Sequence, residues 1–278
     1  MSRSYLMVAG DKKNHLLKLS DLKCDVAMIN LEDGVFNKKE ALNLIFSMFH
    51  KSGLKCVNKK VVVRINPLNE TGIEEIKIIN TLKPDAIRVS KIKTEDDVHL
   101  LLDMVDNDIE IHLSIETKEA LDNLSKLKIN KRVTTVYLGI LDMLESLDLP
   151  QSLVKLDNPT IDYILSKFLI DSKIAGLNPV SFTYQNYKNT NEFEKWCIKV
   201  NRMGFNAKSC ISPMQVDIVN KIFTIKKDDI SKAKYIKKIF ENNKRDGITG
   251  FTDKEYGFID EPIYKDSLLI LEKVDKNN

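Results

Sequence analysis

The chain has 278 residues, 43% of them hydrophobic, and its 43 basic and 40 acidic side chains give a formal net charge of +3. This length and apolar content are enough to bury one large core, so we expect a single domain. Because basic and acidic residues are interspersed along the chain, no basic face is expected, and we do not expect nucleic acid as a partner.

Cysteine usage and hydropathy bear on the compartment. The four cysteines have no CxxC spacing, which predicts neither a disulfide framework nor a zinc site and favours a reducing compartment. The first residues enter an apolar run without the pattern of a signal peptide, and no apolar run approaches the ~18 residues that a membrane span needs. We therefore expect a cytoplasmic protein with no membrane partner. The cysteines are Cys24, Cys56, Cys197 and Cys210.

Eight short apolar runs dominate the pattern of the chain. Each is rich in Val, Ile, Thr or Tyr, and each is followed by a stretch with helical spacing, which predicts strands alternating with helices. Eight such units predict a closed (β/α)8 TIM barrel, whose active-site groups come from the carboxyl ends of the strands. The runs cover residues 5–9, 26–33, 61–66, 86–91, 109–116, 134–142, 179–183 and 207–212.

Helical spacing and caps place the first helices. The pattern predicts a helix over 37–49 and another that begins after an N-cap at Thr94 and three acidic residues. The connection after the sixth run is longer than a crossover needs, so we expect an insertion over 144–156 and then a helix over 160–173. A long sixth loop of this kind is expected to cover a ligand.

The chain continues well beyond the eighth run. Because these elements are not needed to close the sheet, they predict an appended lid or interface element. We expect a TIM-barrel catalytic domain over 1–223 and a C-terminal helical extension or lid over 224–278 that is part of the same domain. The expected elements are helices over 213–223, 226–244 and 264–273 and glycine-containing turns at 247–251 and 257–262.

Polar side chains end several of the runs on the inward face. Strand alternation places Arg64 and Glu116 last on such a face, and Asp142 ends the sixth run. Two carboxylates from neighbouring strands suit Mg²⁺, which leaves its other positions to water and to a chelating 2-keto acid. Arg64 can bind a carboxylate with both arms, and Lys91 adds a second positive charge. The sequence therefore predicts a site for a small dicarboxylic or keto acid.

Structural roles are the alternative for each of these residues. An acid at a strand end is often the N-cap of the next helix, as Glu116 or Asp142 would be. Arg64 can instead pair with a neighbouring acid of the 26–33 run, and Lys91 can be solvated. The inward-facing His112 is expected to be a core histidine and not a catalyst.

The order of the motifs resembles a known family. The chain is similar to the HpcH/HpaI aldolase and citrate lyase family, and it resembles most the citrate lyase beta subunit-like branch. The resemblance implies a TIM barrel, assembled as a trimer or hexamer, that makes or breaks a carbon–carbon bond next to a thioester of coenzyme A or acyl carrier protein. It also implies Mg²⁺ as the cofactor and a lyase of the EC 4.1.3 type. The motifs are VAMINLEDGV, VVVRINPL, IRVSKIKTEDDV, LSIET, YLGILDML, GFNAKSCISPMQVDIVNKIF and FIDEPIY.

The resemblance assigns roles to individual residues. It implies that Glu116 and Asp142 bind the metal and that Arg64 contacts the keto acid carboxylate. It places the acids Glu32 and Asp33 near the metal and makes Lys91 a second cation of the site. Asp260 is expected to be a lid acid that reaches a neighbouring subunit, and Gly139 and Lys12 are expected to contact the substrate.

Several positions depart from the family's pattern. The first strand is followed by Gly10-Asp11-Lys12-Lys13 where the family has a proline–glycine turn and an arginine-rich stretch, and lysine lacks the bidentate fork. These departures put coenzyme recognition and thioester handling in question, while the metal ligands are intact. The other departures are Asn30, Ser90, Ser212 and the acid replaced around Ser181.

The resemblance, taken with these departures, leaves three functions open. The first is cleavage or formation of a 3-hydroxyacyl thioester, with citryl, malyl and citramalyl thioesters giving oxaloacetate, glyoxylate and pyruvate. The second is a coenzyme-free aldolase that acts on a free hydroxy-keto acid. The third is a catalytically impaired family member that acts as a binding or interaction protein.

Overall fold

The computed structural model describes residues 2–275. They divide into two compact units, a barrel unit over residues 2–223 and a C-terminal unit that begins at Thr224. No helix among the described residues is long and apolar enough to cross a membrane.

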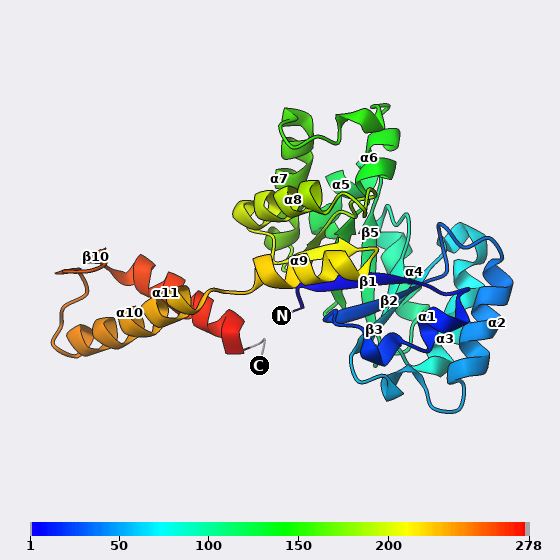
Figure 1. Cartoon of the computed structure of the whole chain (residues 1–278), viewed down its shortest axis with the longest axis horizontal. Helices are drawn as coiled ribbons and strands as arrows, with labels where there is room; N and C mark the ends of the chain where they lie inside the picture. Colours follow the sequence, from blue (N-terminus) through cyan, green and yellow to red (C-terminus); the bar gives the residue numbers. More distant parts are fainter. Residues whose placement is uncertain (1, 276–278) are drawn as a thin grey trace. The chain divides into compact units, whose positions relative to one another are not determined.

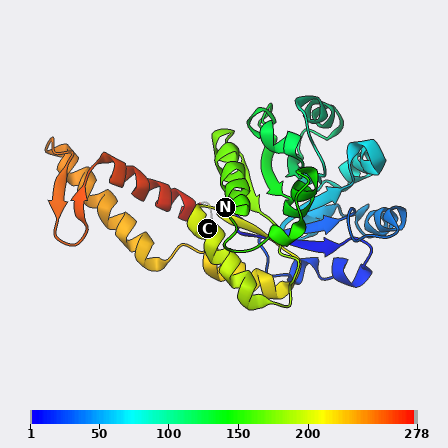
Figure 2. The ribbon, with the colours of Figure 1, turned by 90° about the horizontal axis from the view of Figure 1, so that it is seen from above.

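The barrel unit is a closed ring of eight parallel strands in sequential order, with β1 paired to β8. This confirms the (β/α)8 barrel predicted from the alternating pattern. The helices lie outside the ring of strands (Figure 1, Figure 2). The strands are β1 Ser4–Ala9, β2 Val26–Asn30, β3 Lys60–Ile65, β4 Ala86–Val89, β5 Glu110–Ile115, β6 Val133–Leu138, β7 Asn178–Ser181 and β8 Ala207–Cys210.

The helices of the barrel unit follow the strands along the chain. The N-cap predicted at Thr94 is confirmed, since Thr94 forms a capping box with Asp97. Asn37, expected as the first residue of its helix, instead caps α2 by accepting a hydrogen bond from the backbone of Glu40. The helices are α1 Lys13–Leu16, α2 Lys38–Phe49, α3 Ile73–Leu82, α4 Glu95–Met104, α5 Lys118–Asp122, α6 Ile140–Ser146, α7 Pro159–Ile174, α8 Thr190–Met203 and α9 Pro213–Phe223, with shorter turns at Leu19–Asp21, Leu54–Cys56, Leu68–Gly72, Leu124–Lys126 and Gln151–Leu153.

Strand alternation divides the buried side chains into two layers. Val62 and Ala207 belong to a small cluster inside the barrel, while Val63 and Ile87 belong to a large cluster that includes the apolar side chains of the surrounding helices. Register sets which inward groups are neighbours, because Arg64 pairs with Arg88 and Arg88 pairs with His112. Polar groups from three adjacent strands therefore enter the interior together.

The sixth run differs from its expected extent. β6 ends at Leu138, Gly139 precedes α6, and Asp142 lies in the first turn of that helix and not at the end of a strand. The run TTVYLGILD continues its apolar pattern into the helix, so periodicity alone could not locate the change from strand to helix.

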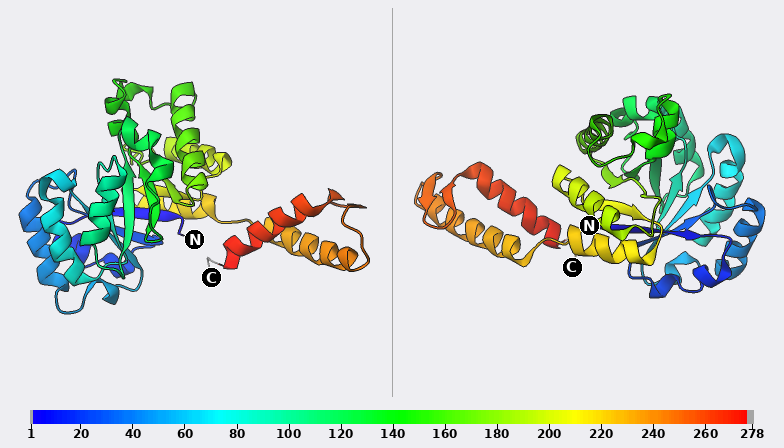
Figure 3. Two further views of the ribbon diagram at one scale, coloured as in Figure 1. Left: turned by 180° about the vertical axis from the view of Figure 1, so that it is seen from behind. Right: turned by 45° about the horizontal axis from the view of Figure 1, so that its top comes forward.

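The C-terminal unit consists of two helices and a hairpin. Helices α10 Lys227–Arg245 and α11 Glu261–Asp275 lie side by side (Figure 3), and β9 Phe251–Asp253 pairs antiparallel with β10 Gly257–Ile259. Its core contains Phe240, whose ring stacks on Tyr264 with centroids 4.5 Å apart. The sequence predicted only turns where the hairpin forms, because each strand has three residues.

Candidate active site

A cavity of about 440 Å³ opens at the carboxyl ends of the barrel strands. Its wall contains Arg64, Glu116 and Asp142, the three residues expected at one site, together with Asp33 and Gly139. Residues from β3 and β4 and from the segments directly after β2, β5 and β6 converge there, as strand ends do in this fold. The remaining lining residues are Met7, Gly34, Arg88, Leu138, Ile140, Leu141, Gln151, Thr183, Gln185 and Ile211.

Arg64 is surrounded by carboxylates. Its Nη2 atom lies 2.5 Å from Oε2 of Glu32, 3.4 Å from Oε1 of Glu116 and 3.5 Å from Oδ2 of Asp33. Its Nε donates a hydrogen bond to Ser90 Oγ at 3.2 Å. Arg64 therefore has both of the features considered from the sequence, since it pairs with the acids of the 26–33 run and also lines the cavity.

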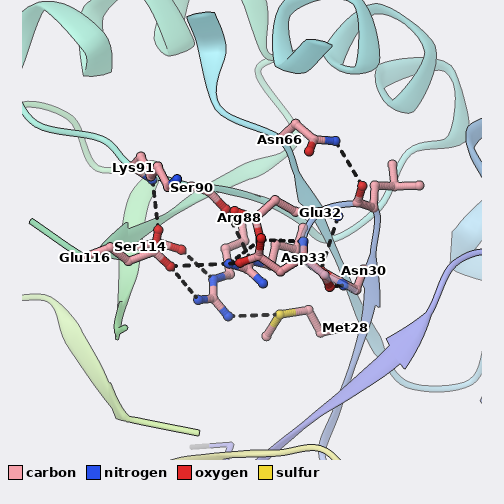
Figure 4. Close-up of polar contacts among 12 residues, drawn as sticks. Met28, Asn30, Glu32, Asp33, Asn66, Arg88, Ser90, Lys91, Ser114 and Glu116 are labelled. Atoms are coloured by element: carbon pink, nitrogen blue, oxygen red, sulfur yellow. Dashed lines mark hydrogen bonds and ion pairs between the residues drawn. The ribbon is translucent and has the colours of Figure 1, made fainter. Parts of the chain in front are cut away.

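Glu116 is held at both of its oxygens. Oε2 accepts a hydrogen bond from the backbone N–H of Lys91 at 3.1 Å (Figure 4), and Oε1 faces the guanidinium of Arg64. A Cβ at Gly139 would lie 2.4 Å from Glu116 Cγ, so only glycine leaves the carboxylate this position. Lys91 itself has φ 55° and an exposed side chain. Its contact with Glu116 is made by the backbone.

Asp142 is half-buried and faces a negative environment. Burial and the charges of Glu116 and Asp33 raise its pKa. Among residues 2–275, no side chain or backbone group forms a hydrogen bond or ion pair with its carboxylate. A half-buried carboxylate without a partner beside a second carboxylate suits a cation.

The carboxylates on the wall fit Mg²⁺ better than a metal that needs a full protein shell. The described part of the chain contains no cluster of three or more His, Cys, Asp or Glu residues suited to hold a metal. Mg²⁺ takes one or two protein carboxylates and keeps water or substrate oxygens in its other positions. Glu116 and Asp142 meet that requirement.

Glu32 and Asp33 are neighbours in the chain but have different environments. Burial and the nearby charge of Glu116 raise the pKa of Glu32 to about 7, against the opposing effect of Arg64. Burial also acts to raise the pKa of Asp33, but hydrogen bonding with Glu32 and the charges of Arg64 and Lys91 hold it below its usual range. Asp33 is therefore a carboxylate near neutral pH, and its side chain is 71% exposed at the cavity.

Arg88 is a site residue that sequence reasoning missed. It is 4% exposed, lines the cavity, and places Nη2 3.7 Å from Glu116 Oε1. The available signal was an arginine inside the apolar run AIRV, on the same strand face as Ser90. A charged side chain at such a position needs polar partners inside the barrel.

Other expected site residues lie elsewhere. Lys12 is exposed and forms an ion pair with Asp11 at 3.2 Å, and it is not among the residues that line the cavity. Asp260 belongs to the C-terminal unit, where its Oδ1 accepts a hydrogen bond from the backbone N–H of Ile263 and caps α11. The inward-facing His112 is fully buried and bonds Tyr137 Oη at 2.9 Å, as a core histidine does.

Three of the other four positions that depart from the family's pattern have hydrogen-bond partners. Asn30 donates to the backbone oxygen of Asp33, Ser90 accepts from Arg64, and Ser212 Oγ accepts from the backbone N–H of Gln215 at the start of α9. Ser181 is fully buried, and its Oγ has no hydrogen-bond partner among the described residues.

A second cavity of about 400 Å³ adjoins the first one. The two share Met7, Asp33, Gly34 and Ile211, so they meet along one wall. The walls of the second cavity are mostly apolar, and His15 and Lys18 contribute its basic groups.

The family model for HpcH/HpaI aldolase/citrate lyase matches residues 3–213, which include every strand of the barrel. The chain belongs to the HpcH/HpaI aldolase/citrate lyase family. This confirms the resemblance seen in the motifs.

Curated relatives in this family carry several names. The chain is 25% identical over 249 residues to a (3S)-malyl-CoA thioesterase of Cereibacter sphaeroides, with 88% of this chain and 85% of the relative covered. It is 25% identical to citrate lyase subunit beta of Haemophilus influenzae, with 98% and 97% covered. It is also 25% identical to the mitochondrial citramalyl-CoA lyase of Rattus norvegicus, with 95% and 83% covered.

Solved structures share the fold of this family member. A citrate lyase from Burkholderia xenovorans has a TM-score of 0.85 at 15% identity, covering 100% of this chain and 92% of that one. Protein CitE from Mycobacterium tuberculosis, in complex with magnesium, acetoacetate and coenzyme A, has a TM-score of 0.76 at 17% identity, covering 98% and 97%.

Proposed function

We propose that this protein is a Mg²⁺-dependent carbon–carbon lyase that cleaves or forms a 3-hydroxyacyl thioester, with a 2-keto acid and an acyl thioester as the other side of the reaction. Citryl, malyl and citramalyl thioesters are the candidate substrates. The observation that carries the proposal is the convergence of Glu116, Asp142 and Arg64 on one cavity. The names of the curated lyase relatives support it.

Glu116 and Asp142 would hold Mg²⁺, which supplies Lewis acidity to the oxygen on which negative charge develops during cleavage. The backbone N–H of Lys91 fixes one Glu116 oxygen, and Gly139 leaves room for the carboxylate. Both contacts orient the Glu116 carboxylate before the substrate binds. We also assign Gly139 to the substrate-binding wall, because it lines the cavity beside Glu116.

Arg64 would bind the carboxylate of the keto acid through its planar guanidinium. Glu32 and Asp33 hold that guanidinium against the wall, since both form ion pairs with it. Asp33, ionised and exposed at the cavity, is the candidate base for the hydroxyl proton of the substrate. Lys91 adds positive charge nearby, which contributes to the low pKa of Asp33 and partly opposes the rise in the pKa of Asp142.

The acyl thioester would enter through the second cavity, because it adjoins the first and has apolar walls. In both coenzyme A and acyl carrier protein, the arm that holds the thioester ends in phosphate. Lys18, which lines the second cavity, is the lysine that would bind this phosphate. Lys12, which lies on the surface in the loop before α1, would make an outer contact with the carrier. We also propose that the protein is cytoplasmic. The resemblance to the family suggests that it assembles as a homotrimer or hexamer.

Asp260 would act as the lid acid at a neighbouring subunit's site. The proposal rests on its FIDEP segment, and Asp260 also has a cap contact within its own unit. An Asp260→Asn variant that keeps its fold and its full turnover would contradict this role.

The test is release of keto acid, trapped as its hydrazone, from citryl, malyl and citramalyl thioesters with and without Mg²⁺. We expect release from one of them that requires Mg²⁺ and is abolished in Glu116→Gln. Running each substrate as the coenzyme A and the acyl carrier protein thioester identifies the carrier. No release from any thioester by a protein that binds Mg²⁺ would contradict the lyase and favour the coenzyme-free aldolase or the binding protein.

Hydrolysis of the thioester is a second candidate, because curated relatives include (3S)-malyl-CoA thioesterases. The same assay separates the two reactions. Hydrolysis releases the thiol and a free hydroxy acid, whereas the lyase releases a keto acid and leaves the thioester bond intact.

A further inference from the structure

Arg88 is a buried cation to which the reaction above gives no task. It projects from β4 into the barrel, and Figure 4 shows it between Glu116, Ser114 and Met28. Its Nε donates to Ser114 Oγ at 2.8 Å, and its guanidinium carbon lies 4.1 Å from the centre of the Tyr137 ring. The group therefore forms part of the inner wall of the cavity.

The contacts of Arg88 fix its orientation but leave donors free. Nη1 is 3.3 Å from the thioether sulfur of Met28, which is a weak acceptor, and Nη2 is 3.7 Å from Glu116, beyond hydrogen-bond distance. No oxygen of the described residues accepts a hydrogen bond from either atom. Stacking on Tyr137 and the bond to Ser114 hold the planar fork rigid.

Arg64 is arranged differently, although it is the register neighbour of Arg88. Its Nη2 is shared among three carboxylates of the protein, and its Nε is bonded to Ser90. A longer ion pair repays the desolvation of a buried guanidinium less fully than charge-assisted hydrogen bonds do. Arg88 has one ion pair, with Glu116 at 3.7 Å, and unlike Arg64 it has no carboxylate at hydrogen-bond distance.

We propose that Arg88 binds a second carboxylate of the substrate at the inner end of the cavity. The site would then select keto acids with two carboxylates, and their thioester precursors, over those with one. One carboxylate would bind near Arg64 and the metal ligands, and the other would accept two hydrogen bonds from Nη1 and Nη2 of Arg88. The inference rests on the proposed function for the identity of the ligand, and its test does not require turnover.

A purely structural role for Arg88 makes a different prediction. If its charge only compensates that of Glu116, its loss would weaken every ligand of the metal site equally. If it binds the second carboxylate, its loss would weaken only ligands that have one. The ratio of two affinities therefore separates the roles, whereas a single activity does not.

The test is calorimetric titration, in Mg²⁺, of fresh oxaloacetate and pyruvate into the full-length protein. These keto acids differ by one carboxylate. We expect the wild type to prefer oxaloacetate by at least tenfold, because a bidentate arginine–carboxylate pair contributes that much or more. Arg88→Met should lose this preference and keep its pyruvate affinity within about threefold. Arg202→Met, an exposed arginine of α8, is the matched control and should change neither affinity.

Three results would overturn the inference. They are no preference in the wild type, an equal loss for both keto acids in Arg88→Met, and binding of neither keto acid. Arg88→Lys keeps the positive charge but lacks the planar fork, so it should lose part of the preference for oxaloacetate over pyruvate. This variant tests the inference if Arg88→Met does not fold. A wild type that prefers oxaloacetate but releases no keto acid from thioesters would contradict the proposed function and leave the role of Arg88 supported.

Discussion

The guanidinium of Arg64 lies 2.5 Å from the carboxylate of Glu32, and both side chains are almost fully buried. Glu116 and Asp33 share the same guanidinium. The arginine thus compensates several negative charges that the fold brings to one wall.

Replacement of Arg64 by methionine should destabilise the protein by ~3–5 kcal/mol, because the buried Glu32 and Glu116 each lose an ion pair and Glu116 keeps only the longer one to Arg88. Urea unfolding measures the loss. Mg²⁺ should raise the melting temperature of Arg64→Met more than that of the wild type, since a cation replaces part of the missing charge. Arg64→Lys, which keeps the charge, is the control. A loss below about 1 kcal/mol in Arg64→Met would show that the ion pairs add little stability.

Replacement of Gly139 by alanine should weaken Mg²⁺ binding. The added Cβ would lie 2.4 Å from Glu116 Cγ, so the carboxylate must move. Displacement of a metal ligand or of its support costs ~10–100-fold in affinity. Titration with Mg²⁺ measures the change, and thermal unfolding shows whether the rest of the barrel is intact. Unchanged affinity in a folded variant would show that Glu116 does not depend on this close approach.

His112 should make the protein less stable in mild acid. Burial lowers the pKa of this imidazole below its usual value of 6.5, in spite of the nearby Glu110. At a pH between the lowered pKa of the folded state and 6.5, the unfolded chain binds a proton at His112 that the folded chain does not. The free energy of unfolding therefore falls as pH drops below about 6.5, by up to ~1.4 kcal/mol per pH unit. Unfolding free energies from pH 7 to pH 5 test this. His112→Gln should flatten the dependence, and His99→Gln, on the exposed side of α4, should not.

Replacement of Lys208 by methionine should stabilise the barrel. This β8 lysine is fully buried, and its Nζ donates to the backbone oxygen of Phe182 at 2.8 Å. Burial lowers its pKa to about 8. The charged form is therefore disfavoured in the fold, and an apolar side chain of similar length should gain ~2–3 kcal/mol at pH 7.

The pH dependence of that gain has a defined sign. Between pH 8 and 10.5 the unfolded chain binds the proton and the folded chain does not, so the wild type should become more stable relative to Lys208→Met as pH rises. Chemical unfolding of both proteins at pH 7 and pH 9.5 measures this difference. Lys234→Met, on the exposed side of α10, should change stability by less than about 0.5 kcal/mol. A destabilised Lys208→Met would show that the carbonyl bond and ring contacts outweigh desolvation.

The sequence by itself determined the barrel, because strand and helix periodicities are local and repeat eight times. It also placed Arg64 and Glu116 on inward faces at strand ends, since alternation fixes the face of every residue within a strand. Caps such as Thr94 were readable for the same reason: their partners lie within one helical turn.

Only the tertiary structure decided which inward groups meet. Arg88 reaches Glu116 because closure and register bring β4 beside β5, and no periodicity within one strand contains that relationship. Asp142 lies in the first turn of α6 because β6 ends four residues earlier, within an apolar run common to both elements. The burial of Lys208 likewise depends on residues outside β8, because its Nζ donates to the backbone oxygen of Phe182 after β7 and lies over the Phe193 ring of α8. Local pattern sets the face of a side chain, but packing between distant segments sets its partner.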